Sequence, residues 1–372
     1  MAIQTSLTRL LGLEHPIIQA PMAGGATTVD LVAAVCRAGA LGSFGAAYDP
    51  PERIVEHASR LRERTGKPFA INLFAPLPEP AAGDPSAMIA LVSAYHEELG
   101  LPPPAVPKWA PDTFEEKLEA VLEVAPAVLS FTFGTIPPSA MEALHERGIL
   151  VMGTATTVDE ALTLEQLGVD AVVAQGSEAG GHRGTFGGPF ESGLVGTMAL
   201  VPAMADALGI PVVASGGIMD GRGVAAALAL GAQSVQMGTA FLTCHEAGVP
   251  EAHKEAILTA REDSTRVTRA FSGRPARGVR NRFMDEIEAA AEPLPFPLQN
   301  SLTRGMRKAA ARAGRGDLIS LWSGQGVRLG RRTGAAELVA AVAAELEATI
   351  SRLGSGTDPG VAQALRSPAV DE

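Results

Sequence analysis

The sequence predicts an α/β protein whose main part is a (β/α)8 barrel, or TIM barrel, with a small added α/β subdomain and C-terminal helices. Short apolar runs alternate with amphipathic segments eight times along the chain. The runs are continuous rather than alternating in polarity, which is typical of parallel strands buried on both faces. The eight units span about 240 residues, close to the ~250 typical of this fold. An open doubly wound sheet is the alternative.

The predicted strands are β-rich and end at or near glycine or another small residue. They are residues 16–22, 40–46, 69–74, 128–134, 150–156, 171–176, 211–217 and 234–241. Helices between them begin at capping residues or prolines and end at glycine, the expected asymmetry of helix termini. Such stop signals stand at Gly39, Gly66, Gly148, Gly168 and Gly231.

Changes in composition predict the division of the chain. Residues 1–242 form the barrel, with a proline-rich insertion at 77–124, and residues 243–290 form a small α+β subdomain. Residues 291–354 are expected to be a helical segment that completes a cover over the active site. The tail, 355–372, is expected to be disordered. Arginines at 266–282 are interpreted as a solvated face, with an anion-facing surface as the alternative.

Composition excludes several classes of protein. The chain has 30 Lys and Arg against 41 Asp and Glu, a net charge of −11, and few aromatic residues, which is unlike a nucleic-acid-binding protein. Cys36 and Cys244 are too few for a disulfide scaffold and suit a reducing compartment. There is no secretory signal pattern and no apolar run of the ~20 residues that a membrane span needs. We therefore expect a cytoplasmic protein with no membrane or nucleic-acid partner.

The predicted strand ends indicate a site for a phosphorylated cofactor and no metal site. Active sites of such barrels lie at the C-terminal ends of the strands, and phosphate often binds after the last two. Here those ends carry glycine, amides and small hydroxyls, with no carboxylate pair or metal-ligand cluster. Main-chain N–H groups near Ser215, Gly216 and Gly217 would converge on an anion with those of Gly238 and Thr239. A plain tight turn at Gly216–Gly217 is the alternative.

A glycine-rich loop follows the sixth predicted strand. Gly180 and Gly181 would let the backbone approach a flat ligand, and Gln175 would donate a hydrogen bond to it. His182 is the one histidine of seven that follows a strand end within such a loop. Its ordinary pKa of ~6.5 suits proton removal from an acidic C–H group or recognition of an anion. His182 is therefore the candidate catalytic residue.

Several motifs resemble the FMN-dependent nitronate monooxygenases, formerly called 2-nitropropane dioxygenases. They are QAPMAGG at 19–25, AINLF at 70–74, AQGSEAGGHRG at 174–184, ASGGIMDGRG at 214–223 and QMGTAFL at 236–242. PLQNSLT at 297–303 and LWSGQG at 321–326 favour class I of this family. The resemblance implies FMN contacts at Met22, Ala23, Asn72, Gln175, Gly180, Gly217, Gln236, Met237, Gly238 and Thr239. It places His182 at the family's catalytic histidine, and Phe296 stands where a tyrosine is expected.

The resemblance implies oxidation of alkyl nitronates with O₂ to a carbonyl compound and nitrite. Met22, Phe133 and Trp322 are expected to form an apolar pocket for the alkyl group. An FMN-dependent NAD(P)H reductase of quinones or enoyl thioesters is the first alternative, and a non-catalytic flavin- or phosphate-binding barrel is the second. The physiological substrate stays open, as does the oligomeric state, for which a homodimer is considered.

Overall fold

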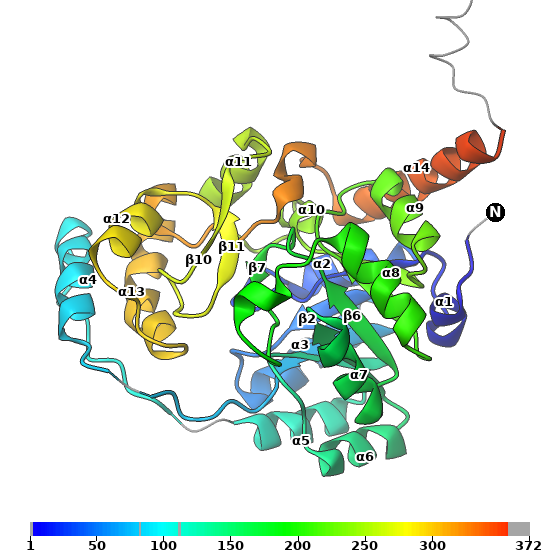
Figure 1. Cartoon of the computed structure of the whole chain (residues 1–372), viewed down its shortest axis with the longest axis horizontal. Coiled ribbons are helices and arrows are strands. Elements are labelled where there is room, and N and C mark those ends of the chain that lie inside the picture. Colours follow the sequence, from blue (N-terminus) through cyan, green and yellow to red (C-terminus); the bar gives the residue numbers. More distant parts are fainter. Residues whose placement is uncertain (1–2, 82, 111–112, 356–372) are drawn as a thin grey trace, which may run out of the picture.

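A closed barrel of eight parallel strands forms the centre of the computed structural model, which describes residues 3–81, 83–110 and 113–355 (Figure 1). The strands follow chain order around the barrel, and pairing of β9 with β1 closes it. A parallel bridge between Ile18 and Leu41 joins β1 to the start of β2. The barrel strands are β1 (Ile17–Gln19), β2 (Gly42–Gly45), β3 (Phe69–Phe74), β4 (Val128–Thr132), β5 (Leu150–Ala155), β6 (Ala171–Gln175), β8 (Val212–Ser215) and β9 (Ser234–Met237). The predicted fold class is confirmed, but the last strand ends at Met237 rather than at residue 241.

Helices cover the outside of the barrel, and most of them connect successive strands. These are α2 (Val29–Arg37), α3 (Pro51–Arg62), α5 (Phe114–Val124), α6 (Pro138–Glu146), α7 (Val158–Gln166), α8 (Thr197–Ala207) and α9 (Gly221–Ala229). A short helix, α1 (Ser6–Leu11), precedes β1, and α10 (Thr239–Leu242) directly follows β9.

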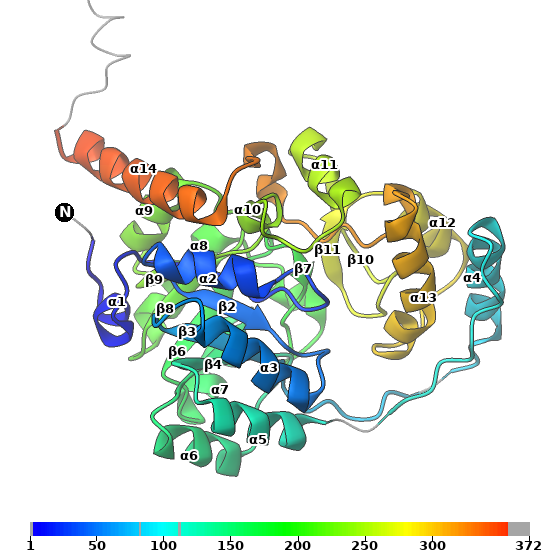
Figure 2. The same ribbon diagram turned by 180° about the vertical axis from the view of Figure 1, so that it is seen from behind.

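The C-terminal helix α14 (Ala335–Ser355) takes the eighth outer position, packed against α9 and α2 (Figure 2). Its apolar side chains, among them Leu338 and Val342, belong to the barrel's own hydrophobic core. The C-terminal segment predicted at 291–354 therefore ends on the barrel wall rather than over the strand ends. Ser355 still belongs to α14, and the rest of the predicted tail lies outside the described residues.

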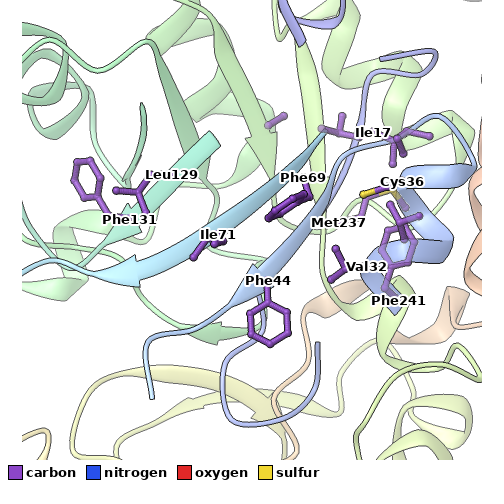
Figure 3. Close-up of a cluster of buried hydrophobic side chains, with 14 of the residues drawn as sticks. Ile17, Val32, Cys36, Phe44, Phe69, Ile71, Leu129, Phe131, Met237 and Phe241 are labelled. Atoms are coloured by element: carbon purple, nitrogen blue, oxygen red, sulfur yellow. The ribbon is translucent and has the colours of Figure 1, made fainter. Parts of the chain in front are cut away.

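The barrel core is made by strands and helices that pack at very short range (Figure 3). Phe69, Ile71 and Phe131 come from barrel strands, and all three are buried. A Cβ atom added at Gly42 would lie 2.6 Å from the Val32 carbonyl oxygen, so β2 needs glycine there to contact α2. At this position the packing of α2 against β2 leaves no room for a side chain.

A second lobe lies beside the barrel mouth (Figure 1). It contains α4 (Ser86–Glu98), α11 (Glu251–Thr259), α12 (Arg282–Ala290), α13 (Leu298–Arg312) and an antiparallel sheet of β10 (Thr265–Thr268), β11 (Ala276–Val279) and β7 (Gly181–His182). Short 3-10 turns complete the chain at η1 (Phe190–Gly193), η2 (Gly316–Leu318) and η3 (Gln325–Leu329). A second hydrophobic cluster joins α4, α12 and α13.

Two predicted boundaries therefore fall inside packed units. The boundary at residue 290 separates α12 from α13, which share the second cluster. The insertion predicted at 77–124 contains both α4, in the second lobe, and α5, which packs against α3 on the barrel. Among the described residues, no helix is both long and apolar enough to cross a membrane.

Candidate active site

A cavity of about 970 Å³ lies at the C-terminal ends of the barrel strands, with α13 and residues 319–326 of the second lobe on its other side. Nearly every residue that the sequence predicts for the site lines it. These are Met22, Ala23, Asn72, Phe133, Gln175, Gly180, Gly181, His182, Ser215, Gly216, Gly217, Gln236, Gly238, Thr239 and Trp322. Met237 is the exception, because its side chain is buried in the barrel core (Figure 3).

The turn after β8 has the backbone that the phosphate prediction needs. Gly216 and Gly217 have φ values of 121° and 72°, which residues with a side chain rarely adopt. Gly238 and Thr239 follow β9 and line the same cavity. The main chains of the turn after β8 and the turn after β9 therefore line the same cavity.

A third segment, 323–326, contacts these turns; it belongs to the predicted cover at 291–354, but none of its residues was predicted individually as a site residue. The Gly324 N–H donates to Thr239 Oγ1 at 2.9 Å. A Cβ atom on Gly180 would lie 2.5 Å from the Gly324 nitrogen, and one on Gly326 would lie 3.1 Å from the Gly217 carbonyl oxygen. Gly324 and Gly326, which flank Gln325, were the feature of the sequence that could have predicted this close approach.

Gln175 and the buried Arg183 hold the loop that leads to His182. Gln175 Nε2 donates to the His182 carbonyl at 3.0 Å, and its Oε1 accepts from the Gly184 N–H at 2.8 Å. The Arg183 guanidinium donates to the backbone carbonyls of Gln175, Gly176 and Gly193. Burial lowers the pKa of Arg183 to about 10, so the side chain remains charged at neutral pH. Sequence reasoning did not single out Arg183.

The second sheet and the surrounding rings fix the position of His182. Its backbone pairs with Ala276 of β11, and its Nε2 lies 2.8 Å from Ser272 Oγ. The rings of Phe133, Phe296 and Trp322 surround the imidazole at centroid distances of 5.8, 5.8 and 5.5 Å. Burial, reinforced by the charges of Arg274 and Arg307, lowers the pKa of His182 to about 3. The imidazole is therefore neutral at physiological pH.

Two arginines near His182 form no ion pair with a carboxylate of the described residues. Arg274 donates to the carbonyls of Arg183 and Thr185, and its guanidinium lies 3.9 Å from the Phe133 ring centroid. Arg307 donates to Asn300, to Thr303 and to a serine hydroxyl. The solvated face predicted for 266–282 is wrong for Arg274, which lies against this site.

His253 of α11, which was not among the predicted site residues, also lines the cavity. Its Nε2 lies 3.1 Å from the carbonyl oxygen of Trp322, and burial lowers its pKa to about 4. A neutral His253 donates this hydrogen bond and so holds the Trp322 segment against the cavity. Its position in α11 gave no sequence signal for this contact.

The chemistry of the lining fits an anionic, planar group better than a metal. The described residues contain no cluster of three or more His, Cys, Asp or Glu side chains that would hold a metal ion. The acidic lining residues are Asp30 and Asp49, and neither is on the turns after β6, β8 or β9. Those turns offer glycine main chain, amides and hydroxyls, the groups that hold a phosphate and a flat heterocycle.

Comparison with known proteins gives a consistent result along nearly the whole chain. A family model described as nitronate monooxygenase matches residues 4–345. A probable nitronate monooxygenase of Staphylococcus saprophyticus is 42% identical over 360 residues, which cover 95% of this chain and 100% of that protein. A probable nitronate monooxygenase of Staphylococcus aureus is 44% identical over 326 residues, which cover 87% of this chain and 92% of that protein.

Solved structures show the same relationship. Nitroalkane oxidase from Streptomyces ansochromogenes superposes with a TM-score of 0.88 at 40% identity, covering 93% of this chain and 99% of its own. FabK from Thermotoga maritima superposes with a TM-score of 0.76 at 31% identity, covering 95% of this chain and 100% of its own. The chain therefore belongs to the nitronate monooxygenase family, and it is an enzyme of the flavin-dependent oxidoreductase kind.

Proposed function

We propose that this protein uses FMN to oxidise alkyl nitronates with O₂, giving a carbonyl compound and nitrite. FMN, when bound, supplies the electron acceptor for the nitronate and the donor for O₂. One observation carries the proposal: a single cavity combines two glycine turns suited to phosphate with a neutral histidine, and the nearby Arg274 and Arg307 form no ion pair with a carboxylate of the described residues. Each part of this arrangement has a separate task.

The glycine turns would hold the cofactor. Main-chain N–H groups of Ser215, Gly216 and Gly217 would bind the phosphate together with those of Gly238 and Thr239. Thr239 Oγ1 already accepts the Gly324 N–H, so its own proton is available for an anionic oxygen. Asn72 and Gln175 would contact the polar edge of the ring, and Met22 and Ala23 would lie against its face.

The surroundings of His182 would select an anionic substrate with an apolar tail. Arg274 and Arg307 disfavour a proton on His182, and the same positive potential attracts a nitronate anion. Phe133 and Trp322, which line the cavity beside His182, would offer apolar surface for a small alkyl group. A nitronate is already a delocalised carbanion, so it needs no base before oxidation.

A second candidate is an NAD(P)H-dependent reductase, and the charge of α13 favours it. Arg304, Arg307 and Lys308 line the cavity, and none of them forms an ion pair with a carboxylate of the described residues. Such cations suit the phosphates of a dinucleotide.

Anaerobic stopped-flow absorbance on the FMN-loaded protein separates the two. We expect flavin bleaching within the turnover time on mixing with ethyl nitronate, and much slower bleaching with NADH or NADPH. Readmission of O₂ should restore the oxidised spectrum with nitrite released. Fast bleaching by a nicotinamide nucleotide together with none by nitronate would reverse the assignment.

A further inference from the structure

Among the described residues, the imidazole of His182 has one hydrogen-bond partner, the hydroxyl of Ser272 at 2.8 Å from Nε2. Ser272 is 1% exposed and does not line the cavity, whereas His182 does. Among the described residues Nδ1 has no hydrogen-bond partner. The contact with Ser272 therefore takes one ring nitrogen and leaves the other for a ligand in the cavity.

The hydroxyl of Ser272 has a second partner, the backbone of Arg274. Its Oγ donates to the Arg274 carbonyl oxygen at 3.1 Å and accepts from the Arg274 N–H at 3.3 Å. A hydroxyl carries a single proton. If Ser272 gives that proton to Arg274, the bond to His182 needs a proton on Nε2. If Ser272 gives it to Nε2 instead, the Arg274 carbonyl loses its one partner among the described residues.

We propose that Ser272 is a positioning residue that fixes His182 as the Nε2–H tautomer, so that the lone pair of Nδ1 is directed to the substrate. This inference rests on the proposed function of the cavity and extends it to neutral nitroalkanes. Nδ1 takes the proton from the carbon that bears the nitro group, the C–H electron pair becomes the C=N bond, and the N=O π pair moves onto oxygen to give the nitronate. The imidazolium keeps its Nε2–H bond to Ser272, and the new nitronate anion lies beside it. No oxidant is needed for this step.

The other arrangement of protons would give different chemistry. With Nδ1 protonated, His182 would donate to a nitronate and would have no lone pair for a neutral nitroalkane. The tautomer therefore decides whether turnover of neutral nitroalkanes or turnover of nitronates depends on His182. Loss of Ser272 should harm nitroalkane turnover more than nitronate turnover, whereas general damage to the site should harm both alike.

The first test is spectroscopic and uses the unmodified holoenzyme. Long-range ¹H–¹⁵N spectra of protein labelled at histidine, with the signal of His182 identified from the His182→Asn variant, report which nitrogen carries the proton. We expect protonated Nε2 and unprotonated Nδ1 near neutral pH. The reverse assignment overturns the proposal, whatever the enzyme oxidises.

The second test is kinetic and uses Ser272→Ala, with Ser264→Ala as the matched control. Ser264 lies just before β10 of the same sheet, and its hydroxyl accepts from the Arg261 N–H instead. For Ser272→Ala we expect the ratio of nitroethane kcat to ethyl nitronate kcat to fall by roughly tenfold or more, the scale of a lost orienting contact. Ser264→Ala should keep the wild-type ratio, and Ser272→Thr, which retains the hydroxyl, should restore most of it.

Equal losses on both substrates would show that Ser272 is merely structural and would overturn the proposal. If Ser272→Ala fails to fold, the spectroscopic test still decides the tautomer. If the wild-type enzyme oxidises no nitronate at all, the proposed function fails while the tautomer measurement keeps its meaning. The two failures are therefore distinguishable.

Discussion

His182 combines a fixed position with an unusual electrostatic environment. The resemblance placed the catalytic group there, and the structure brings it to the cavity between three aromatic rings. We expect His182→Asn to keep FMN bound and to slow nitroalkane turnover by roughly 10²-fold, the scale of lost acid–base catalysis. Flavin absorbance and steady-state rates measure the two effects. His145→Asn, at an exposed site on α6, is the control, and full activity of His182→Asn would remove His182 from the mechanism.

The environment of His182 also predicts the pH profile. A pKa of about 3 lies below the ordinary value of ~6.5, so the base form persists as pH falls and is lost only near pH 3. We expect kcat/KM for nitroethane, added fresh as the neutral acid, to show no histidine limb between about pH 5 and 8. A limb centred near pH 6.5 would mean that the ring is solvated in the working enzyme.

Gly217 tests the phosphate site directly. Its φ of 72° disfavours any side chain, and an added Cβ would lie 3.3 Å from Glu178 Cβ. We expect Gly217→Asp to purify without FMN, because the carboxylate repels the phosphate and the turn is strained. Gly188→Asp adds the same charge at an exposed glycine with open space around it and should stay yellow. A fully yellow Gly217→Asp protein contradicts the placement of the phosphate.

At the scale of elements, the predictable parts are those that local patterns decide. The barrel strands were predictable because buried parallel strands leave continuous apolar runs, and the turns after β8 and β9 because the fold places phosphate there. The end of β9 was not predictable, because the apolar run continues past it. Ala240, Phe241 and Leu242 would suit a strand as well as the short helix α10 that they form. Periodicity alone does not separate the two.

Other parts depend on contacts between distant segments. Ser272 and Arg274 reach the site through the second lobe, roughly 90 residues beyond the loop of His182, and no local pattern in the sequence indicates that approach. Arg183 is an unusual case, because an arginine that is 1% exposed and bonded to carbonyls looks in sequence like a surface residue. The place of His182 at the cavity was predictable, but its hydrogen-bond partner Ser272 was not.

The position of α14 also depends on contacts between distant segments, which the sequence does not predict. Its packing can be tested. The sequence predicted a helix, but an amphipathic stripe does not say which surface it covers. Leu338 is 1% exposed in the barrel core, so Leu338→Ala should lower the free energy of unfolding by about 2–5 kcal/mol. Urea unfolding measures the loss, with Leu353→Ala, at a site 71% exposed, as the control on the same helix. An equal effect of both variants would place Leu338 outside the core.

At the scale of the whole molecule, the cavity lies where the barrel and the second lobe meet, so a bound cofactor should stabilise both. A ligand that binds only the folded state adds about 2.7 kcal/mol at a free concentration 100 times its Kd. We expect FMN to raise the Tm of the apoprotein, and riboflavin, which lacks the phosphate, to raise it less. Equal shifts from FMN and riboflavin would argue against a phosphate site at Gly217.

The place of α14 on the barrel wall has a consequence for biosynthesis. The chain leaves the barrel after β9, builds much of the second lobe, and returns to contact α2 and α9 only from Ala335 onward. While residues 243–334 are still being translated, the apolar surface of α2 and α9 that α14 later covers is exposed to solvent. The segment that covers these two helices is therefore made after both of them and after much of the second lobe.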